Sequence, residues 1–207
     1  MIPTSLGILK NLHFLDLALN NLSGNLPVSL YNLSSMEGMQ IQFNMLTGSI
    51  ASDIGSRFPG MRYLGLSGNQ FTGHIPASLS NLTSLQFLYL SANRLSGYVP
   101  RTVGRLHGIQ YLYLNHNMLE ADEGDGWEFI TSLSNCSQLE RLLITGNPAF
   151  TGHLPSSLVN LSTTLQFLTF DATGISGSLP SAIAHRQSGG SSNTLYWEYF
   201  YIRKNSR

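Results

Sequence analysis

A leucine spacing that returns every 24 to 30 residues constrains the fold of this chain more than any other feature of the sequence. Seven segments begin with the pattern L-x-x-L-x-L, in which Met, Ile or Phe can replace Leu, and they start at Leu12, Met36, Met61, Leu85, Ile109, Leu139 and Leu165. The last two apolar residues of the pattern alternate with another residue, so both point to one face of a short strand. Self-similarity at such a period predicts a solenoid, in which every repeat buries its apolar face against its neighbours.

The copies share a longer consensus, L-x-x-L-x-L-x-x-N-x-L-[ST]-G-x-[IL]-P-x-x-L-x-x-L-x-x. This consensus resembles the plant extracellular form of the leucine-rich repeat, and the resemblance covers about residues 2–184. It implies an α/β repeat solenoid with a parallel concave β-sheet and irregular or 3-10 segments on the convex side. We therefore divide the chain into a partial repeat (1–11), about seven leucine-rich repeats (12–184) and an irregular Gly/Ser linker with an aromatic-basic tail (185–207).

The two ends of the sequence depart from the repeat. Residues 1–11 correspond to the back half of a repeat without its strand, and the repeat register is lost after Ala184. One interpretation is an internal part of a longer solenoid that is truncated or mis-spliced at both ends, without a signal peptide or a membrane helix. The alternative is that the tail covers the last coil with Trp197, Tyr199 and Tyr201.

One asparagine follows the strand of each of the first six copies. A buried asparagine amide can bond the backbone of its own turn and of the neighbouring coil, so these side chains are predicted to form a ladder along the stack. The seventh copy has Thr173 instead, which indicates that the regular stack is ending. The predicted ladder consists of Asn20, Asn44, Asn69, Asn93, Asn117 and Asn147.

Variable residues between and after the strand leucines are expected to face solvent in columns, with neighbours about 4.8 Å apart. Tyr89 and Tyr113 then become adjacent phenols, with Ser91, Asn115 and His116 beside them. Tyrosine combines apolar contact area with a hydrogen-bonding hydroxyl, so the cluster predicts binding of a peptide or protein ligand. The alternative is that the tyrosines form a cross-strand pair that only stabilises the sheet.

Two further groups of side chains fall in the same region of the repeat. A second, weaker candidate binding patch consists of Gln40, Gln42 and Phe43. An aromatic column at one fixed register is interpreted mainly as repeat packing, and its members are Phe14, Tyr63, Phe87, Tyr111 and Phe167.

Five N-x-[ST] sequons predict N-glycosylation and passage through the secretory pathway. Chance and duplication of a consensus are the alternative explanations, since three of the five share one register of the repeat. The single cysteine, Cys136, replaces a conserved leucine and is expected to be a small buried apolar residue. The five acceptor asparagines are Asn21, Asn32, Asn81, Asn135 and Asn160.

The fifth copy carries an insertion, EADEGDGWEFITSLSNCSQL. Its core, W-E-F-x-x-S-L-x-N-C-x-Q-L, resembles a repeat of plant receptor-like kinases of the immune-receptor group. Such proteins have an extracellular repeat array, one membrane helix and a cytoplasmic Ser/Thr kinase. The insertion also brings four acidic residues together, which we interpret as a solvated loop, since their spacing does not match an EF-hand: Asp122, Glu123, Asp125 and Glu128.

Composition and motifs argue against other function classes. The net charge is zero and only 11% of the residues are charged, so neither nucleic-acid binding nor contact with a membrane surface is expected. We find no signature of a hydrolase, zinc protease, nucleotide-binding loop or kinase catalytic loop. With one cysteine and scattered histidines, neither a metal nor another cofactor is expected.

The sequence therefore predicts a non-catalytic, ligand-recognising segment of a plant cell-surface receptor-like kinase in defence or peptide signalling. Its expected partners are a peptide or protein ligand and a co-receptor with its own leucine-rich repeats. Its expected location is the extracellular face of the plasma membrane, as part of a longer protein. The alternatives are a secreted inhibitor of a cell-wall-degrading enzyme and a nonfunctional truncated gene product.

Overall fold

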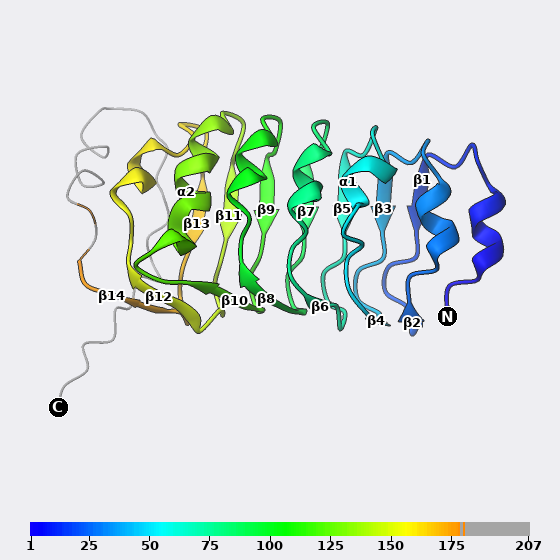
Figure 1. Ribbon diagram of the computed structural model, residues 1–207, viewed down its shortest axis with the longest axis horizontal. Helices are drawn as coiled ribbons and strands as arrows, with labels where there is room; N and C mark the ends of the chain where they lie inside the picture. The colour runs from blue at the N-terminus through cyan, green and yellow to red at the C-terminus, as the bar shows by residue number, and fades with distance from the viewer. Residues whose placement is uncertain (179, 181–207) are drawn as a thin grey trace.

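In the computed structural model, which describes residues 1–178 and 180, the backbone forms a row of coils stacked along one axis (Figure 1). Each coil contributes one short strand to a main parallel sheet, whose strands lie in sequence order, each joined to the next by the rest of its coil. Within the described residues the strands are β1 (Phe14–Asp16), β3 (Gly38–Gln40), β5 (Tyr63–Gly65), β7 (Phe87–Tyr89), β9 (Tyr111–Tyr113), β11 (Arg141–Leu143) and β13 (Phe167–Thr169).

The register of the main sheet pairs equivalent residues of consecutive repeats. Leu88 lies opposite Leu64 on one side and Leu112 on the other. The middle residue of each strand points into the stack, and Leu64, Leu88 and Leu112 are all buried. The two flanking residues of each strand point outward because side chains alternate along a strand. This arrangement confirms the predicted parallel sheet and its columns of side chains.

A second row of short strands runs along the lower edge of the coils in Figure 1 and was not predicted from the sequence. It follows the asparagine turn, where the chain again lies parallel to its neighbours and its backbone groups need partners. In this row β6, β8, β10, β12 and β14 pair in that order in one sheet, and β2 pairs with β4 in another. The strands are β2 (Ser23–Asn25), β4 (Met45–Thr47), β6 (Thr72–Gly73), β8 (Arg94–Tyr98), β10 (Met118–Ala121), β12 (Ala149–His153) and β14 (Gly174–Ser176).

Short helical segments return the chain on the convex side, as the resemblance implied. Proline precedes η1, η2, η3, η4 and η7, where its fixed φ suits the entry to a turn of helix. The 3-10 segments are η1 (Thr4–Ile8), η2 (Val28–Asn32), η3 (Ala77–Asn81), η4 (Arg101–Arg105), η5 (Asp125–Trp127), η6 (Leu133–Asn135) and η7 (Ser156–Asn160), and the α-helical turns are α1 (Ile54–Arg57) and α2 (Glu128–Ser132).

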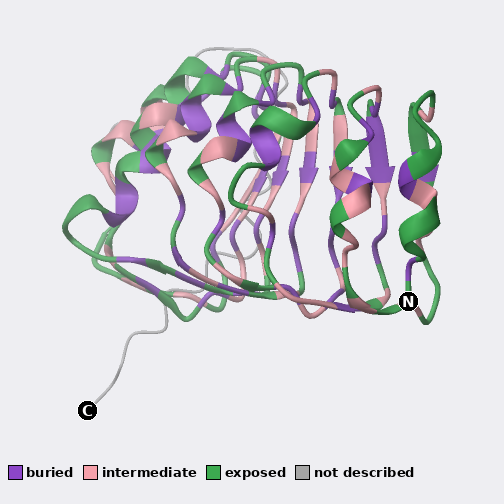
Figure 2. Ribbon diagram, turned by 45° about the vertical axis from the view of Figure 1, so that its right-hand side comes forward, coloured by how far each residue is buried: buried purple, intermediate pink, exposed green. Residues whose placement is uncertain are grey.

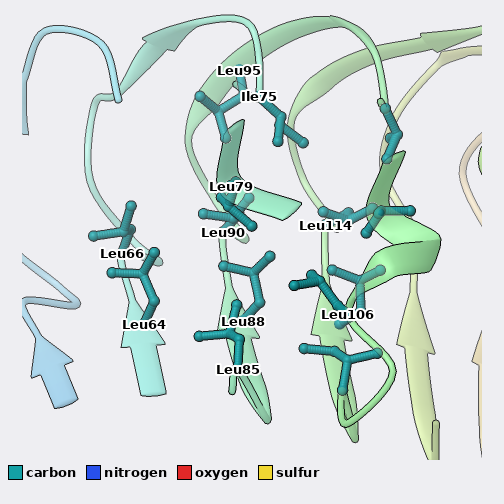
Figure 3. Close-up of a cluster of buried hydrophobic side chains, with 14 of the residues drawn as sticks. Leu64, Leu66, Ile75, Leu79, Leu85, Leu88, Leu90, Leu95, Leu106 and Leu114 are labelled. Carbon is teal, nitrogen blue, oxygen red and sulfur yellow. The ribbon is translucent and has the colours of Figure 1, made fainter. Parts of the chain in front are cut away.

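One continuous apolar core fills the space between the sheets and the helical segments (Figure 2). Figure 3 shows leucines of successive repeats, such as Leu64, Leu88 and Leu114, packed in layers. The insertion in the fifth copy extends this core, because Trp127 is buried against Phe150, with ring centroids 5.4 Å apart. Its indole nitrogen donates to the carbonyl of Thr151.

The predicted asparagine ladder is present. Asn117, for example, donates from Nδ2 to the carbonyl of Leu90 in the preceding coil and accepts the N–H of Leu95 on Oδ1. Asn44, Asn69, Asn93 and Asn147 make the equivalent pair of bonds. At the first strand the side chain of Asn20 bonds only its own turn, and the hydroxyl of Thr173 bonds only Phe170, so these two side chains do not join coils.

Other expectations concern burial and the C-terminal residues. Cys136 is buried as predicted, and burial raises the pKa of its thiol to about 11, so it is not a thiolate at neutral pH. Within the described residues, no helix has both the length and the apolar character needed to cross a bilayer. The proposed cap residues Trp197, Tyr199 and Tyr201 lie outside the described residues.

Candidate functional site

The outward side of the main sheet, here called the concave face, carries three columns of side chains, one residue per coil in each. The first column is Phe14, Gly38, Tyr63, Phe87, Tyr111, Arg141 and Phe167. The second is Asp16, Gln40, Gly65, Tyr89, Tyr113, Leu143 and Thr169. The third column, two residues further along each coil, is Ala18, Gln42, Ser67, Ser91, Asn115, Thr145 and Asp171.

Tyr89 and Tyr113 lie side by side, as the sequence predicted. Their ring centroids are 4.8 Å apart with an edge-to-face angle of 71°, the geometry that aromatic pairs prefer. Both rings are half-buried, so part of each remains available to a ligand. Burial is the main cause of the raised pKa of Tyr89, and neighbouring phenols add to it.

The aromatic residues of the first column join this pair in one surface. Tyr63 contacts both Phe87 and Tyr89, with centroids 5.8 and 5.2 Å apart, and Phe87 contacts Tyr111 at 5.2 Å. We call Tyr63, Phe87, Tyr89, Tyr111 and Tyr113 the aromatic surface. From the sequence, the first column was interpreted mainly as packing and the tyrosine pair as a candidate site, whereas in the structure the two are in contact.

Arg141 borders the aromatic surface. Its guanidinium lies 4.9 Å from the ring centroid of Tyr111 and 4.3 Å from that of Phe167, so it is held by cation–π contacts on both sides. None of the ion pairs formed by the described residues includes Arg141. Arg141 was not among the candidates predicted from the sequence, although its place in a column of aromatic residues was the available signal.

Two candidate residues were expected to face solvent and are buried. Gln42 is 9% exposed because its amide folds over Gly65, which has no side chain to occupy that space. Ser91 is also 9% exposed, and its hydroxyl donates to Asn115 Oδ1 at 2.6 Å. The expectation of exposure was wrong for both, because each side chain contacts a residue of the next coil, Gln42 at Gly65 and Ser91 at Asn115. Gln40 and Asn115 are half-buried, and Phe43 and His116 are exposed.

Phe43 and His116 share a strained backbone position. Each has φ near +55°, a region that side chains other than glycine rarely adopt. The ring of Phe43 lies over Gly68, and that of His116 lies over Gly146, in the next coil. The turn that follows each strand of the main sheet imposes this conformation. The spacing of residues in the sequence did not predict it.

Three buried polar atoms have no hydrogen-bond partner among the described residues: Gln42 Oε1, Ser67 Oγ and Arg141 Nε. All three belong to side chains of the concave face. Most buried polar atoms in proteins are paired, so unpaired ones call for a specific explanation. Ser67 was not selected from the sequence, where nothing distinguishes it from other serines of the repeat.

The predicted glycan acceptors are all exposed: Asn21, Asn32, Asn81, Asn135 and Asn160. Four of them end the 3-10 segments η2, η3, η6 and η7, on the convex side of the coils (Figure 1). Asn21 follows the turn between β1 and β2.

The acidic residues of the fifth copy are also exposed. Tyr98 donates its hydroxyl to Asp122 at 2.6 Å, which lowers the pKa of that carboxyl. Glu123 pairs with His153 at 3.0 Å, and Glu128 lies 3.5 Å from Arg101. No group of three or more His, Cys, Asp or Glu side chains within the described part of the chain is placed to hold a metal ion.

Comparisons with known proteins identify the repeat. A model described as leucine rich repeat matches residues 39–95 and 59–119, and a second model of that description matches residues 11–33. Receptor kinase-like protein Xa21 of Oryza sativa subsp. japonica is 41% identical over 68 residues, which are 33% of this chain and 6% of that protein.

Solved plant receptors share the fold. The plant peptide hormone receptor RGFR1, in complex with RGF2, is 34% identical with a TM-score of 0.80, over 88% of this chain and 28% of that one. The Arabidopsis receptor kinase HAESA, in complex with the peptide hormone IDA and the co-receptor SERK1, is 29% identical with a TM-score of 0.78, over 88% and 30% of the two chains. The present chain thus spans less than a third of each of these proteins.

Proposed function

Because this chain belongs to the leucine-rich repeat family and is homologous to plant receptors, we propose that it is the ligand-recognising part of a receptor ectodomain. The segment itself is non-catalytic and binds an extended peptide across the strands of the concave face. The aromatic surface carries this proposal: its half-buried rings and phenol hydroxyls combine apolar contact area with hydrogen-bonding groups.

The rest of the receptor is proposed by homology. The similar proteins include a receptor kinase-like protein and two receptors bound to peptide hormones, one of them with a co-receptor. We assign the present segment to the extracellular side of a plasma-membrane receptor-like kinase that signals in defence or in response to a peptide. A co-receptor with its own leucine-rich repeats is the second proposed partner.

Glycosylation of the five exposed sequons agrees with this location. Four glycans would stand on the convex side, at the ends of η2, η3, η6 and η7. They would leave the concave face open, which restricts the approach of a protein partner to the sheet side or to an edge of the coils.

The proposal is tested by selecting, from a pool of random linear peptides, those that bind the immobilised 207-residue chain. Peptides enriched on the wild-type protein are expected to bind the double variant Tyr89→Ala/Tyr113→Ala at least about tenfold more weakly, because central aromatic side chains dominate binding energies. Affinity is measured by titration calorimetry, and urea unfolding checks that the variant is folded.

Tyr98→Ala is the matched control. Tyr98 is an exposed tyrosine of β8 on the second row of strands, away from the concave face, so its loss should leave affinity unchanged. Equal affinities of the wild-type protein and the double variant for every enriched peptide would refute the proposed binding surface.

A further inference from the structure

The third column of the concave face contains an interruption in its hydrogen bonding. Ser91 donates to Asn115, and Thr145 bonds both Thr169 and Asp171. At the second and third strands of the sheet, however, Gln42 Oε1 and Ser67 Oγ have no partner among the described residues. Both side chains are more than nine-tenths buried, with exposures of 9% and 8%.

Gly65 creates the space that the amide of Gln42 fills, in the same coil as Ser67. It lies between Gln40 and Tyr89 in the second column, and the register places it directly opposite both. A Cβ atom at this position would lie 2.2 Å from Gln42 Nε2, so the amide of Gln42 occupies the volume of the missing side chain. The amide is held at one end only, where Nε2 donates to the hydroxyl of Tyr63 at 3.0 Å.

The surroundings of Gly65 and of the Gln42 amide that covers it are neutral and partly apolar. Tyr63 and Tyr89 flank it, with ring centroids 5.2 Å apart, and Gln40 and Ser91 complete the border in the neighbouring coils. Unpaired polar atoms next to aromatic rings are shielded from water, so a hydrogen bond formed there is stronger than one formed in bulk solvent.

We infer that Gln42 and Ser67 form a subsite that binds one carboxamide group of the peptide ligand. The oxygen of Gln42 accepts the N–H of that group, and the hydroxyl of Ser67 donates to its carbonyl. A small rotation of the Gln42 side chain, which breaks only its bond to Tyr63, opens the subsite. The inference rests on the proposed function, since it assigns the polar specificity of the same concave face.

The free protein gives a first test that needs no ligand. Ser67→Ala removes an unpaired hydroxyl and should leave the urea midpoint of unfolding unchanged or raise it. Ser91→Ala, the matched control, removes a hydroxyl that donates to Asn115 and should lower the midpoint. A fall with Ser67→Ala as large as that with Ser91→Ala would show that Ser67 is already paired, and would overturn the inference.

The binding test uses peptides from the random pool that bind the wild-type chain and lose affinity for Tyr89→Ala/Tyr113→Ala. Gln42→Met and Ser67→Ala should each lower the affinity for these peptides about tenfold, because the amide group of the ligand then loses a hydrogen-bond partner in a site shielded from water. Gln70→Met and Ser96→Ala, at positions outside the three columns, are the controls and should bind as the wild type does.

The outcomes separate the two claims. Affinity that falls with the tyrosine variant but not with Gln42→Met or Ser67→Ala overturns the inference and leaves the proposed function standing. Affinity unchanged by the tyrosine variant overturns both, as does a pool from which no peptide is enriched.

The source of the carboxamide is resolved on one enriched peptide. Backbone N-methylation at a single position that abolishes the effect of Gln42→Met identifies a main-chain amide. Replacement of a peptide Asn or Gln by Leu with the same consequence identifies a side chain. If neither change alters the effect of Gln42→Met, the subsite does not bind an amide and the inference fails.

Discussion

At the scale of single residues, the turn after each strand holds non-glycine side chains in a left-handed backbone conformation. Leu19, Phe43, Ala92, His116 and Ala172 all have φ between 52° and 57°, and Gly68 and Gly146 occupy the same position of the repeat. This conformation costs an L-residue about 1–2 kcal/mol relative to the right-handed region. The cost is tolerated because the neighbouring coils fix the turn through backbone hydrogen bonds, such as that from Ala92 N to Asn115 O.

Replacing Ala92 by glycine is therefore expected to increase stability. Relief of the strained φ of 52° outweighs the extra freedom that glycine gives the unfolded chain, so the free energy of unfolding should rise by about 0.5–1 kcal/mol. Ala77→Gly, at an exposed position of η3, should lower it by about the same amount. Urea titrations measure both, and equal losses for the two variants would contradict this account of the turn.

Residue positions on the concave face were predictable, whereas their environment was only partly so. Alternation along a strand placed Tyr89 beside Tyr113 correctly. Alternation also predicted that Gln42 and Ser91 face solvent. Both are buried, because alternation takes no account of what a side chain contacts in the next coil. Gly65 was visible in the sequence, but only the packed structure shows that Gln42 folds over it.

At the scale of elements, the asparagine turn is the device that joins one coil to the next. Its amide accepts and donates across the boundary between coils, as Asn117 does with Leu95 and Leu90, in a buried environment. The pattern N-x-L was enough to predict this ladder, since a buried amide needs partners on both sides.

Asn117→Ala should lower the free energy of unfolding by about 2–4 kcal/mol, because it leaves the Leu95 N–H and several carbonyls unpaired in the core. Asn20→Ala is the matched control. The side chain of Asn20 is exposed and bonds only the carbonyls of its own turn, at Leu17 and Ala18, so its loss should be under about 1 kcal/mol. Chemical denaturation compares the two, and similar losses would argue against a cooperative ladder.

The second row of strands could not be predicted from the same pattern. Its strands are as short as two residues, such as β6 (Thr72–Gly73), and carry glycine, which is uncommon in strands. They form because the stack places equivalent segments in parallel, which is a property of neighbouring coils rather than of one repeat. The helical segments were implied by the resemblance to the leucine-rich repeat, and a proline precedes five of them.

At the scale of the whole molecule, repetition converts a column in the sequence into a continuous surface. Each coil adds one residue to every column, so substitutions in single repeats change the concave face without disturbing the core of leucines in Figure 3. The period of the sequence was sufficient to predict this architecture. A repeat pattern does not specify which coils would bind the proposed peptide ligand. This depends on contacts between side chains of neighbouring coils, such as those of Tyr63, Tyr89 and Gln42.

The most direct measurement of the central claim is hydrogen–deuterium exchange of the whole chain with and without an enriched peptide. Binding across the concave face predicts slower exchange in β5, β7 and β9 and in the turns that follow them, with the 3-10 segments unchanged. Slower exchange confined to η2–η7 or to the second row of strands, with the main sheet unaffected, would contradict the proposed site of recognition.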